Sequence, residues 1–202
     1  MNRRRIRDNP EVRRAQILEE GLKLVGKHGY YGLTVQALAK QCGISNAGLL
    51  YYFSSKDQIL LGLLDELERR EAELIAPVVD AALLATGGEA RRSALTRMMR
   101  AMVERVMGQG SLGRFITVLQ AEALDHSHPA HDWFVERERL TIDLLASLLE
   151  EVLPHSRSAA RQLYAMMHGL GLQWFRTDGA FNLIEEWDRA SGCILGAGTA
   201  AA

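Results

Sequence analysis

The stretch that decides the fold runs from Thr34 to Lys56 and reads TVQALAKQCGISNAGLLYYFSSK. Its first half predicts a short helix, because apolar residues recur at helical spacing along one face: Val35, Leu38, Ala39 and Cys42. Thr34 can cap the start of this helix with its hydroxyl, and Gly43 can end it in a left-handed turn.

A second short helix is expected directly after this turn. Ile44 can fill the turn, and Ser45 can cap the helix that follows. That helix opens with small or polar residues, which let its backbone approach another surface closely: Asn46, Ala47 and Gly48. Two short helices of this kind are typical of a helix-turn-helix, whose second helix meets base edges in the major groove. A helical hairpin inside an ordinary bundle is the alternative.

These residues resemble the DNA-binding domain of the tetracycline-repressor (TetR) family of transcription factors. The resemblance covers roughly residues 11 to 71 and rests on a multi-point motif: Thr34, Leu38-Ala39, Gly43-Ile44-Ser45, Leu49, Tyr52-Phe53 and Ser55-Lys56. One position departs from the family, which usually has a phosphate-holding Tyr where this chain has Leu50. Leu50 has no hydroxyl for that contact, whereas Tyr51 and Tyr52 each offer one.

The net charge of −1 conceals two parts of opposite sign. Residues 1–56 carry 10 Lys and Arg against 4 Asp and Glu, and residues 57–202 carry 14 against 21. A basic first part suits a polyanion such as DNA, and an acidic remainder suits a body that avoids it. With the resemblance, this predicts a basic arm and DNA-binding domain over 1–55 (motif 34–53), followed by a ligand-binding and dimerisation domain over 56–202.

The fold class is predicted to be all-α, with about nine helices. Four prolines and few β-branched runs leave little room for a sheet. Asn9 is expected to cap the first helix and Ser54 the long helix at 56–76, while 108–113 is expected to be a loop. Besides the two motif helices, we expect helices over residues 10–29, 56–76, 77–84, 91–107, 114–124, 129–153, 158–176 and 182–195.

Composition and motifs exclude several classes of protein. No apolar run is long enough to span a bilayer, and no apolar stretch follows the N-terminal arginines as in a signal peptide. The widely separated Cys42 and Cys193 favour a reducing, cytoplasmic setting. The chain has no glycine-rich phosphate loop, nucleophile elbow or zinc-protease histidine pair. We therefore expect neither an enzyme nor a resident cofactor.

Candidate DNA contacts follow from side-chain chemistry. The Asn46 amide can bond adenine edges or a phosphate, and Lys56 offers a point charge to a phosphate. The full set is Thr34, Gln36, Ser45, Asn46, Ala47, Gly48, Tyr51, Tyr52 and Lys56, with Lys40 and Gln41 as further outward-facing candidates. The arm with Arg3, Arg4, Arg5 and Arg7 fits either a minor-groove extension or a solvated tail.

The resemblance also implies a ligand pocket in the body. Its candidate lining is an aromatic and methionine set, which is equally typical of an ordinary core: Met98, Met102, Phe115, Leu119, Trp133, Phe134, Tyr164, Met167, His168 and Trp174. A mostly apolar lining favours a hydrophobic or amphipathic effector. The segment Asp125–His131, DHSHPAH, could bind a divalent metal, or its histidines could cap a helix end; no metal site is assigned.

The last two expected helices are unusually apolar, and Gly169 and Gly171 permit close helix approach. TetR-like proteins pair these helices across a two-fold axis, and such a homodimer can read a palindrome. The alternative is a plain monomer core. The resemblance implies a repressor that binds a double-stranded DNA operator and is released by a small effector. The alternative function is a helical scaffold that uses the helix-turn-helix for protein contacts.

Overall fold

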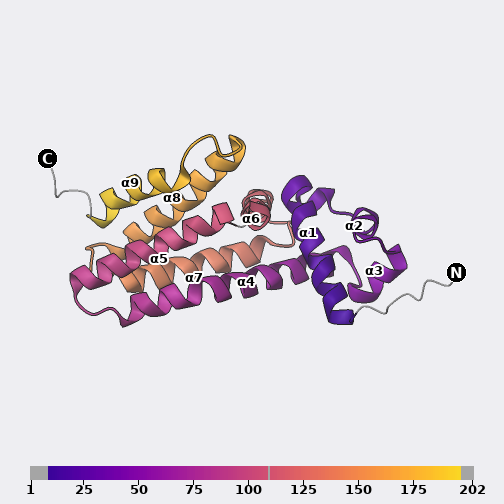
Figure 1. The fold of residues 1–202 in the computed structure, drawn as a ribbon, viewed down its shortest axis with the longest axis horizontal. Helices are drawn as coiled ribbons and strands as arrows, with labels where there is room; N and C mark the ends of the chain where they lie inside the picture. The colour runs from indigo at the N-terminus through magenta and orange to yellow at the C-terminus, as the bar shows by residue number, and fades with distance from the viewer. Residues whose placement is uncertain (1–8, 109, 197–202) are drawn as a thin grey trace.

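The computed structural model describes residues 9–108 and 110–196. Within these residues the chain forms nine α-helices and no strand, which confirms the predicted fold class (Figure 1). The helices are α1 (Pro10–Gly32), α2 (Val35–Gln41), α3 (Asn46–Tyr52), α4 (Lys56–Leu84), α5 (Gly88–Gly108), α6 (Gly110–Glu122), α7 (His131–Leu149), α8 (Ser156–Arg176) and α9 (Leu183–Leu195). None of these helices is both long and apolar enough to cross a membrane. The predicted arginine arm lies outside the described residues.

The molecule is elongated, with α1, α2 and α3 together at one end (Figure 1). The helix α4 starts beside them and runs into the body, where it packs against α5. The helix α6 lies at the junction and packs along α1. Two helices, α4 and α6, therefore join the small end of the molecule to the body.

The predicted caps around the motif are confirmed. The Thr34 hydroxyl accepts a hydrogen bond from the Ala37 backbone N–H, and the Ser45 hydroxyl accepts one from Gly48, each over 3.0 Å. Gly43 has a φ of +66°, the left-handed conformation that lets the chain turn between α2 and α3. The Asn9 side chain likewise caps α1 ahead of Pro10.

Two predictions about α4 are wrong. Ser55 rather than Ser54 caps the helix, with its hydroxyl accepting from the Gln58 backbone N–H over 3.1 Å. Pro77 does not begin a new helix but lies inside α4. A proline leaves the carbonyl four residues earlier without its partner. Here Pro77 and Glu73 are both exposed, so water can bond that carbonyl and the helix continues.

The helix boundaries near the junction also differ from expectation. Residues 110–113, predicted as loop, form the first turn of α6, where the buried Leu112 packs into the core. α7 spans His131–Leu149 rather than 129–153. α1 continues past Gly29, its predicted end, but the helix is broken there by a φ of +71° and a ψ of 177°.

The buried residues form two cores. The first joins α1, α2, α3 and the start of α4 to α6, whose Phe115 and Leu119 are fully buried in it. The second fills the body between α5, α7, α8 and α9. Because α6 belongs to the first core, a movement of α6 in the body is felt directly by the small end of the molecule.

Candidate functional site

One face of the helix α3 packs on the first core and the other face is exposed. Leu49 is fully buried, whereas Tyr51 is 82% exposed and Leu50 is 42% exposed. Asn46 and Ala47, in the first turn, are also exposed. We call the exposed side chains of α2 and α3 and their caps the recognition surface, namely Thr34, Gln36, Lys40, Gln41, Ser45, Asn46, Ala47, Leu50 and Tyr51.

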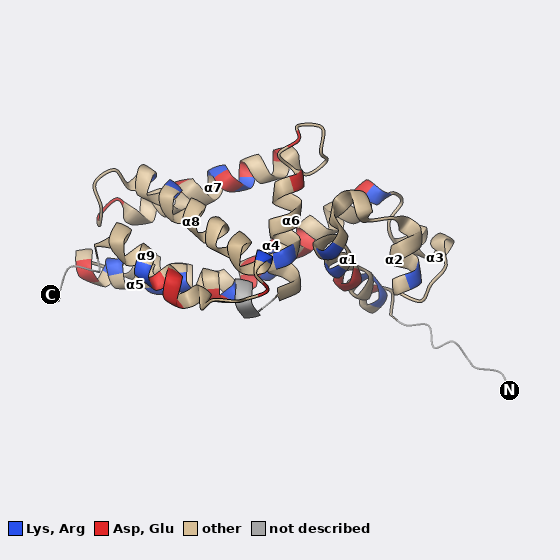
Figure 2. Ribbon diagram, turned by 90° about the horizontal axis from the view of Figure 1, so that it is seen from above, with Lys and Arg blue, Asp and Glu red and all other residues tan. Residues whose placement is uncertain are grey.

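The recognition surface has an uncharged centre and a basic surround. The segment Asn46–Tyr52 contains no charged residue, while Lys and Arg lie on α1 and α2 beside it (Figure 2). A reader of DNA needs cations at the phosphates and hydrogen-bonding or apolar groups at the bases. The distribution of side chains meets this requirement, with Asn46 supplying the amide.

Other predicted DNA contacts are less open than the sequence suggested. Tyr52 is half-buried against the first core, and its ring meets the Tyr51 ring edge-on with centroids 5.3 Å apart. Gly48 is half-buried, and a Cβ at that position would lie 3.3 Å from the Ser45 hydroxyl oxygen. Its small size therefore also protects the cap of α3.

Lys56, predicted as a phosphate contact, lies at the first turn of α4. Its Nζ is 4.0 Å from the centroid of the Tyr30 ring, a cation–π contact that holds the side chain half-buried. The Tyr30 hydroxyl donates a hydrogen bond to Asp57 in the same turn. Gln41, the other outward candidate, donates to Glu20 over 2.6 Å and so ties α2 to α1.

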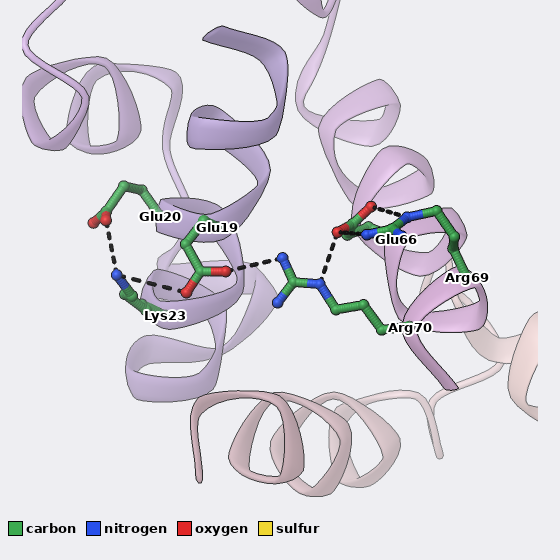
Figure 3. A network of polar contacts seen from close by, with 6 residues as sticks. All are labelled: Glu19, Glu20, Lys23, Glu66, Arg69 and Arg70. Atoms are coloured by element: carbon green, nitrogen blue, oxygen red, sulfur yellow. Dashed lines mark hydrogen bonds and ion pairs between the residues drawn. The ribbon is translucent and has the colours of Figure 1, made fainter. Parts of the chain in front are cut away.

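Polar contacts connect α4 to α1 close to the body (Figure 3). The Arg70 guanidinium donates to Glu19 on α1 over 2.9 Å and to Glu66 on its own helix over 2.7 Å. These ion pairs are only partly buried, so each contributes little to stability, typically below about 1 kcal/mol. Their role here is geometric, because the fork of Arg70 fixes where α1 sits along α4.

The body encloses a cavity of about 160 Å³. Four of the ten predicted lining residues are found there: Met102, Tyr164, Met167 and His168. The rest of the wall comes from α4 (Glu71, Ile75), α5 (Arg105), α6 (Gly113, Ile116, Thr117), α7 (Arg137, Thr141, Leu144) and Gly171 of α8. Both helices that reach the small end of the molecule, α4 and α6, thus line the cavity.

The other six candidates lie elsewhere. Met98 is buried in the second core, while Phe115, Leu119 and Phe134 are buried in the first. Trp133 packs on that first core, and Trp174 lines a separate shallow pocket with Arg114 and Phe175. Helical spacing placed all six on inward faces, but it did not tell which inward face meets the cavity.

Sequence reasoning missed the charged side chains of the cavity wall: Glu71, Arg105 and Arg137. Glu71 is only 5% exposed. A signal for it existed, because Leu63 and Leu67 precede it at intervals of four on the buried face of α4. A single carboxylate that continues an apolar stripe requires a buried partner.

The titratable groups of the wall are shifted by burial. Burial lowers the pKa of His168 to about 4, with repulsion from Arg137 and Arg105 adding to the effect. Burial raises the pKa of Tyr164 to about 12. Both side chains are therefore uncharged near neutral pH, so the arginines and Glu71 set the charge of the cavity.

The Asp125–His131 segment is a capping turn. The His131 ring Nδ1 lies 2.8 Å from the Ala123 carbonyl oxygen at the end of α6, and the Ala130 backbone N–H donates to His128 Nδ1. Among the described residues, no group of three potential ligands is placed to hold a metal ion. The turn thus joins the end of α6 to the start of α7.

Comparison with known proteins identifies one matching family, two similar curated proteins and one similar solved structure. Residues 17–63 match the family of bacterial regulatory proteins named tetR. The chain is 27% identical over 173 residues to the HTH-type transcriptional regulator BetI of Stenotrophomonas maltophilia, covering 85% of each chain. It is 37% identical over 65 residues to the HTH-type transcriptional repressor AcnR of Corynebacterium diphtheriae, covering 32% of this chain and 34% of that one. The structure of AibR in complex with isovaleryl coenzyme A and operator DNA aligns with a TM-score of 0.73 at 20% identity, over 91% of this chain and 98% of that one.

Proposed function

Because this chain is a DNA-binding transcriptional regulator of the TetR family, we propose that it is a repressor released by a small effector. A homodimer would bind a palindromic operator through its two copies of α3. An amphipathic effector in the body cavity would lower that affinity. The observation that carries the proposal is that α4 and α6 both line the cavity and both pack against α1 of the small end.

The exposure of their side chains divides the predicted DNA contacts into base-reading and backbone-binding residues. Asn46 and Ala47, exposed on α3, would read base edges, with Ala47 able to meet a thymine methyl. The remaining predicted contacts would bind the backbone or support the readers: Thr34, Gln36, Ser45, Gly48, Tyr52 and Lys56. The phosphate contact that Leu50 cannot make would pass to the Tyr51 hydroxyl, since Tyr52 is half-buried.

A dimer interface on α8 and α9 is supported by their unburied apolar side chains. The second core takes up Leu163 and Trp187, but other apolar residues of the two helices remain partly exposed: Met166, Leu170, Leu172, Ile184 and Ile194. Gly169 has open space around it, so a second helix can approach α8 closely there. The domain division proposed is residues 1–55 for DNA and 56–202 for effector and partner.

Derepression requires the effector to favour one of two arrangements. An effector that moves α4 or α6 would change the spacing of the recognition helices in the dimer. Operator half-sites lie about one helical turn apart, roughly 34–36 Å, so small changes in spacing reduce affinity. The neighbouring AibR structure contains both an acyl coenzyme A and operator DNA, which supports an amphipathic effector for a body of this fold.

Two other classes of function are disfavoured by the matches. Two of the curated relatives are an HTH-type transcriptional regulator and an HTH-type transcriptional repressor. The proposed function is tested by crosslinking the protein to DNA in cells and sequencing the enriched sites. A shared two-fold symmetric motif, lost with Asn46→Ala/Tyr51→Ala, supports it. Enrichment without a common motif, or unchanged by the double substitution, contradicts it.

A further inference from the structure

A buried ionic triad occupies one wall of the body cavity. Glu71 of α4 places one carboxylate oxygen 2.7 Å from the Arg105 guanidinium of α5, and its other oxygen pairs with Arg137 of α7. The Glu71 side chain is 7% exposed and that of Arg105 10% exposed. A single carboxylate thus forms ion pairs with two arginines from two different helices, although its oxygen beside Arg105 makes no hydrogen bond.

The triad leaves one positive charge without a counterion in the cavity wall. Two guanidinium groups face one carboxylate, and the remaining described side chains of the wall are uncharged near neutral pH. In addition, Nη1 of Arg105 is buried without a hydrogen-bond partner. A desolvated, incompletely paired cation destabilises the protein, and an anion in the cavity would relieve that cost.

The rest of the wall limits the shape of such an anion. Its apolar side chains are Ile75, Met102, Ile116, Leu144 and Met167. A cavity of about 160 Å³ has room for on the order of ten water-sized positions. The space fits a short apolar chain with one charged end, of roughly ten non-hydrogen atoms.

We propose that the effector is a short amphiphile with an oxyanion head, a carboxylate or a phosphate, which takes up the unpaired positive charge of Arg105 and Arg137 and competes with Glu71 for their guanidinium groups. This inference rests on the proposed function only in treating the cavity as the effector site. Guanidinium groups bind such heads through paired hydrogen bonds, and the apolar tail lies among Ile75, Met102 and Met167.

Displacement of Glu71 would connect ligand binding to the small end of the molecule, which holds α1, α2 and α3. Glu71 forms ion pairs from α4 to both α5 and α7. Once an external anion takes the two arginines, α4 loses these bonds and can shift relative to the body. Ligand and operator would then each disfavour the other's preferred state, with the same coupling free energy in both directions.

The direct test is titration calorimetry on the full chain with octanoate, octyl phosphate and octanol, which share a tail and differ in the head. We expect at least one anion to bind about tenfold or more tightly than octanol, the ratio that one added ion pair of about 1.4 kcal/mol supplies. The two anions distinguish a carboxylate from a phosphate head. Equal binding of the alcohol, or binding of octanoyl coenzyme A alone, overturns the proposal.

Substitutions locate the site. Glu71→Gln removes the internal competitor and is expected to tighten the anion several-fold. The double variant Glu71→Gln/Arg137→Gln keeps the wall at one positive charge and is expected to lose most of the preference for anion over alcohol. Arg139→Gln, at an exposed position on the same helix, is the matched control and should bind as the parent does. Loss of anion binding in this control, or its retention in the double variant, contradicts the assignment.

The last readout is operator binding, on DNA recovered by the crosslinking experiment. We expect Glu71→Gln to bind operator more weakly without ligand, and octanoate or octyl phosphate to weaken the parent but not the double variant. Tight operator binding by Glu71→Gln, unaffected by either anion, overturns the switch. If no operator is recovered while the anion preference still follows the triad, the proposed function fails and the binding site stands.

Discussion

The backbone N–H of Tyr30 in α1 donates a hydrogen bond to the Glu122 carboxylate at the end of α6, over 2.6 Å. This bond connects α6, which lines the cavity, directly to α1 at the small end of the molecule. The break in α1 at Gly29 makes it possible, because it frees the Tyr30 N–H from the helix. In the proposed mechanism, this bond is a second connection from the cavity to α1, besides α4.

Gly29→Ala is predicted to destabilise the protein by more than about 1 kcal/mol, since φ is +71° and a Cβ would lie 2.1 Å from a Glu122 oxygen. Urea denaturation measures the effect. Gly88→Ala is the control, because a Cβ there meets nothing within 4 Å. A Gly29→Ala variant as stable as the Gly88→Ala variant would show that the Tyr30–Glu122 contact tolerates a side chain.

Lys56→Gln separates two roles for this lysine. A phosphate contact would give a smaller salt dependence of operator binding, with the slope falling by about one. A purely structural cation–π contact with Tyr30 would instead lower stability and leave the slope unchanged. We predict the smaller slope, measured by fluorescence anisotropy across a salt series. Lys27→Gln, an exposed position on α1, controls for general loss of charge.

Gly169→Glu is predicted to convert the proposed dimer to a monomer without unfolding it. The monomer has open space at this position, so the new side chain costs little there. A close helix contact across the two-fold axis would have no room for it and would bury its charge. Sedimentation equilibrium gives the oligomeric state. A dimer of unchanged affinity would place the interface away from this part of α8.

His168 should titrate far below an ordinary histidine, because burial lowers its pKa to about 4 from 6.5. The unfolded chain then binds this proton more tightly than the folded one. Its contribution to stability is therefore fully present above about pH 6.5 and is lost as the pH falls toward 4. NMR titration of the imidazole measures the value directly, with His28→Gln and His168→Gln spectra assigning the signals. A pKa near 6.5 would mean that the cavity is open to water.

Interactions between residues close in sequence could be predicted from the sequence, whereas packing between distant helices could not. Thr34, Ser45 and Gly43 each act on atoms within four residues, so their roles follow from the motif. The prediction that a helix begins at Pro77 was wrong, because the effect of a proline depends on whether water reaches the carbonyl that it leaves unpaired, here that of Glu73. The first turn of α6 was missed because it is stabilised by packing on α1 rather than by its own propensity.

The charged residues of the cavity could not be predicted for the same reason. Its methionines and aromatic residues lie on predicted inward faces, but only contacts between α4, α5 and α7 bring Glu71, Arg105 and Arg137 together. These three residues are 34 and 32 positions apart in the chain. Nothing in the local pattern around any one of them specifies the other two.

The most direct test of the proposed function is the affinity of the purified protein for DNA from immediately upstream of its own gene, or for the enriched site, at two salt concentrations. A dimeric operator-binding regulator is expected to bind tightly, with an affinity that weakens steeply with salt, requires both halves of a palindrome, and falls at least about tenfold in Asn46→Ala/Tyr51→Ala. Binding that is weak, indifferent to sequence and unchanged by the double substitution would contradict it.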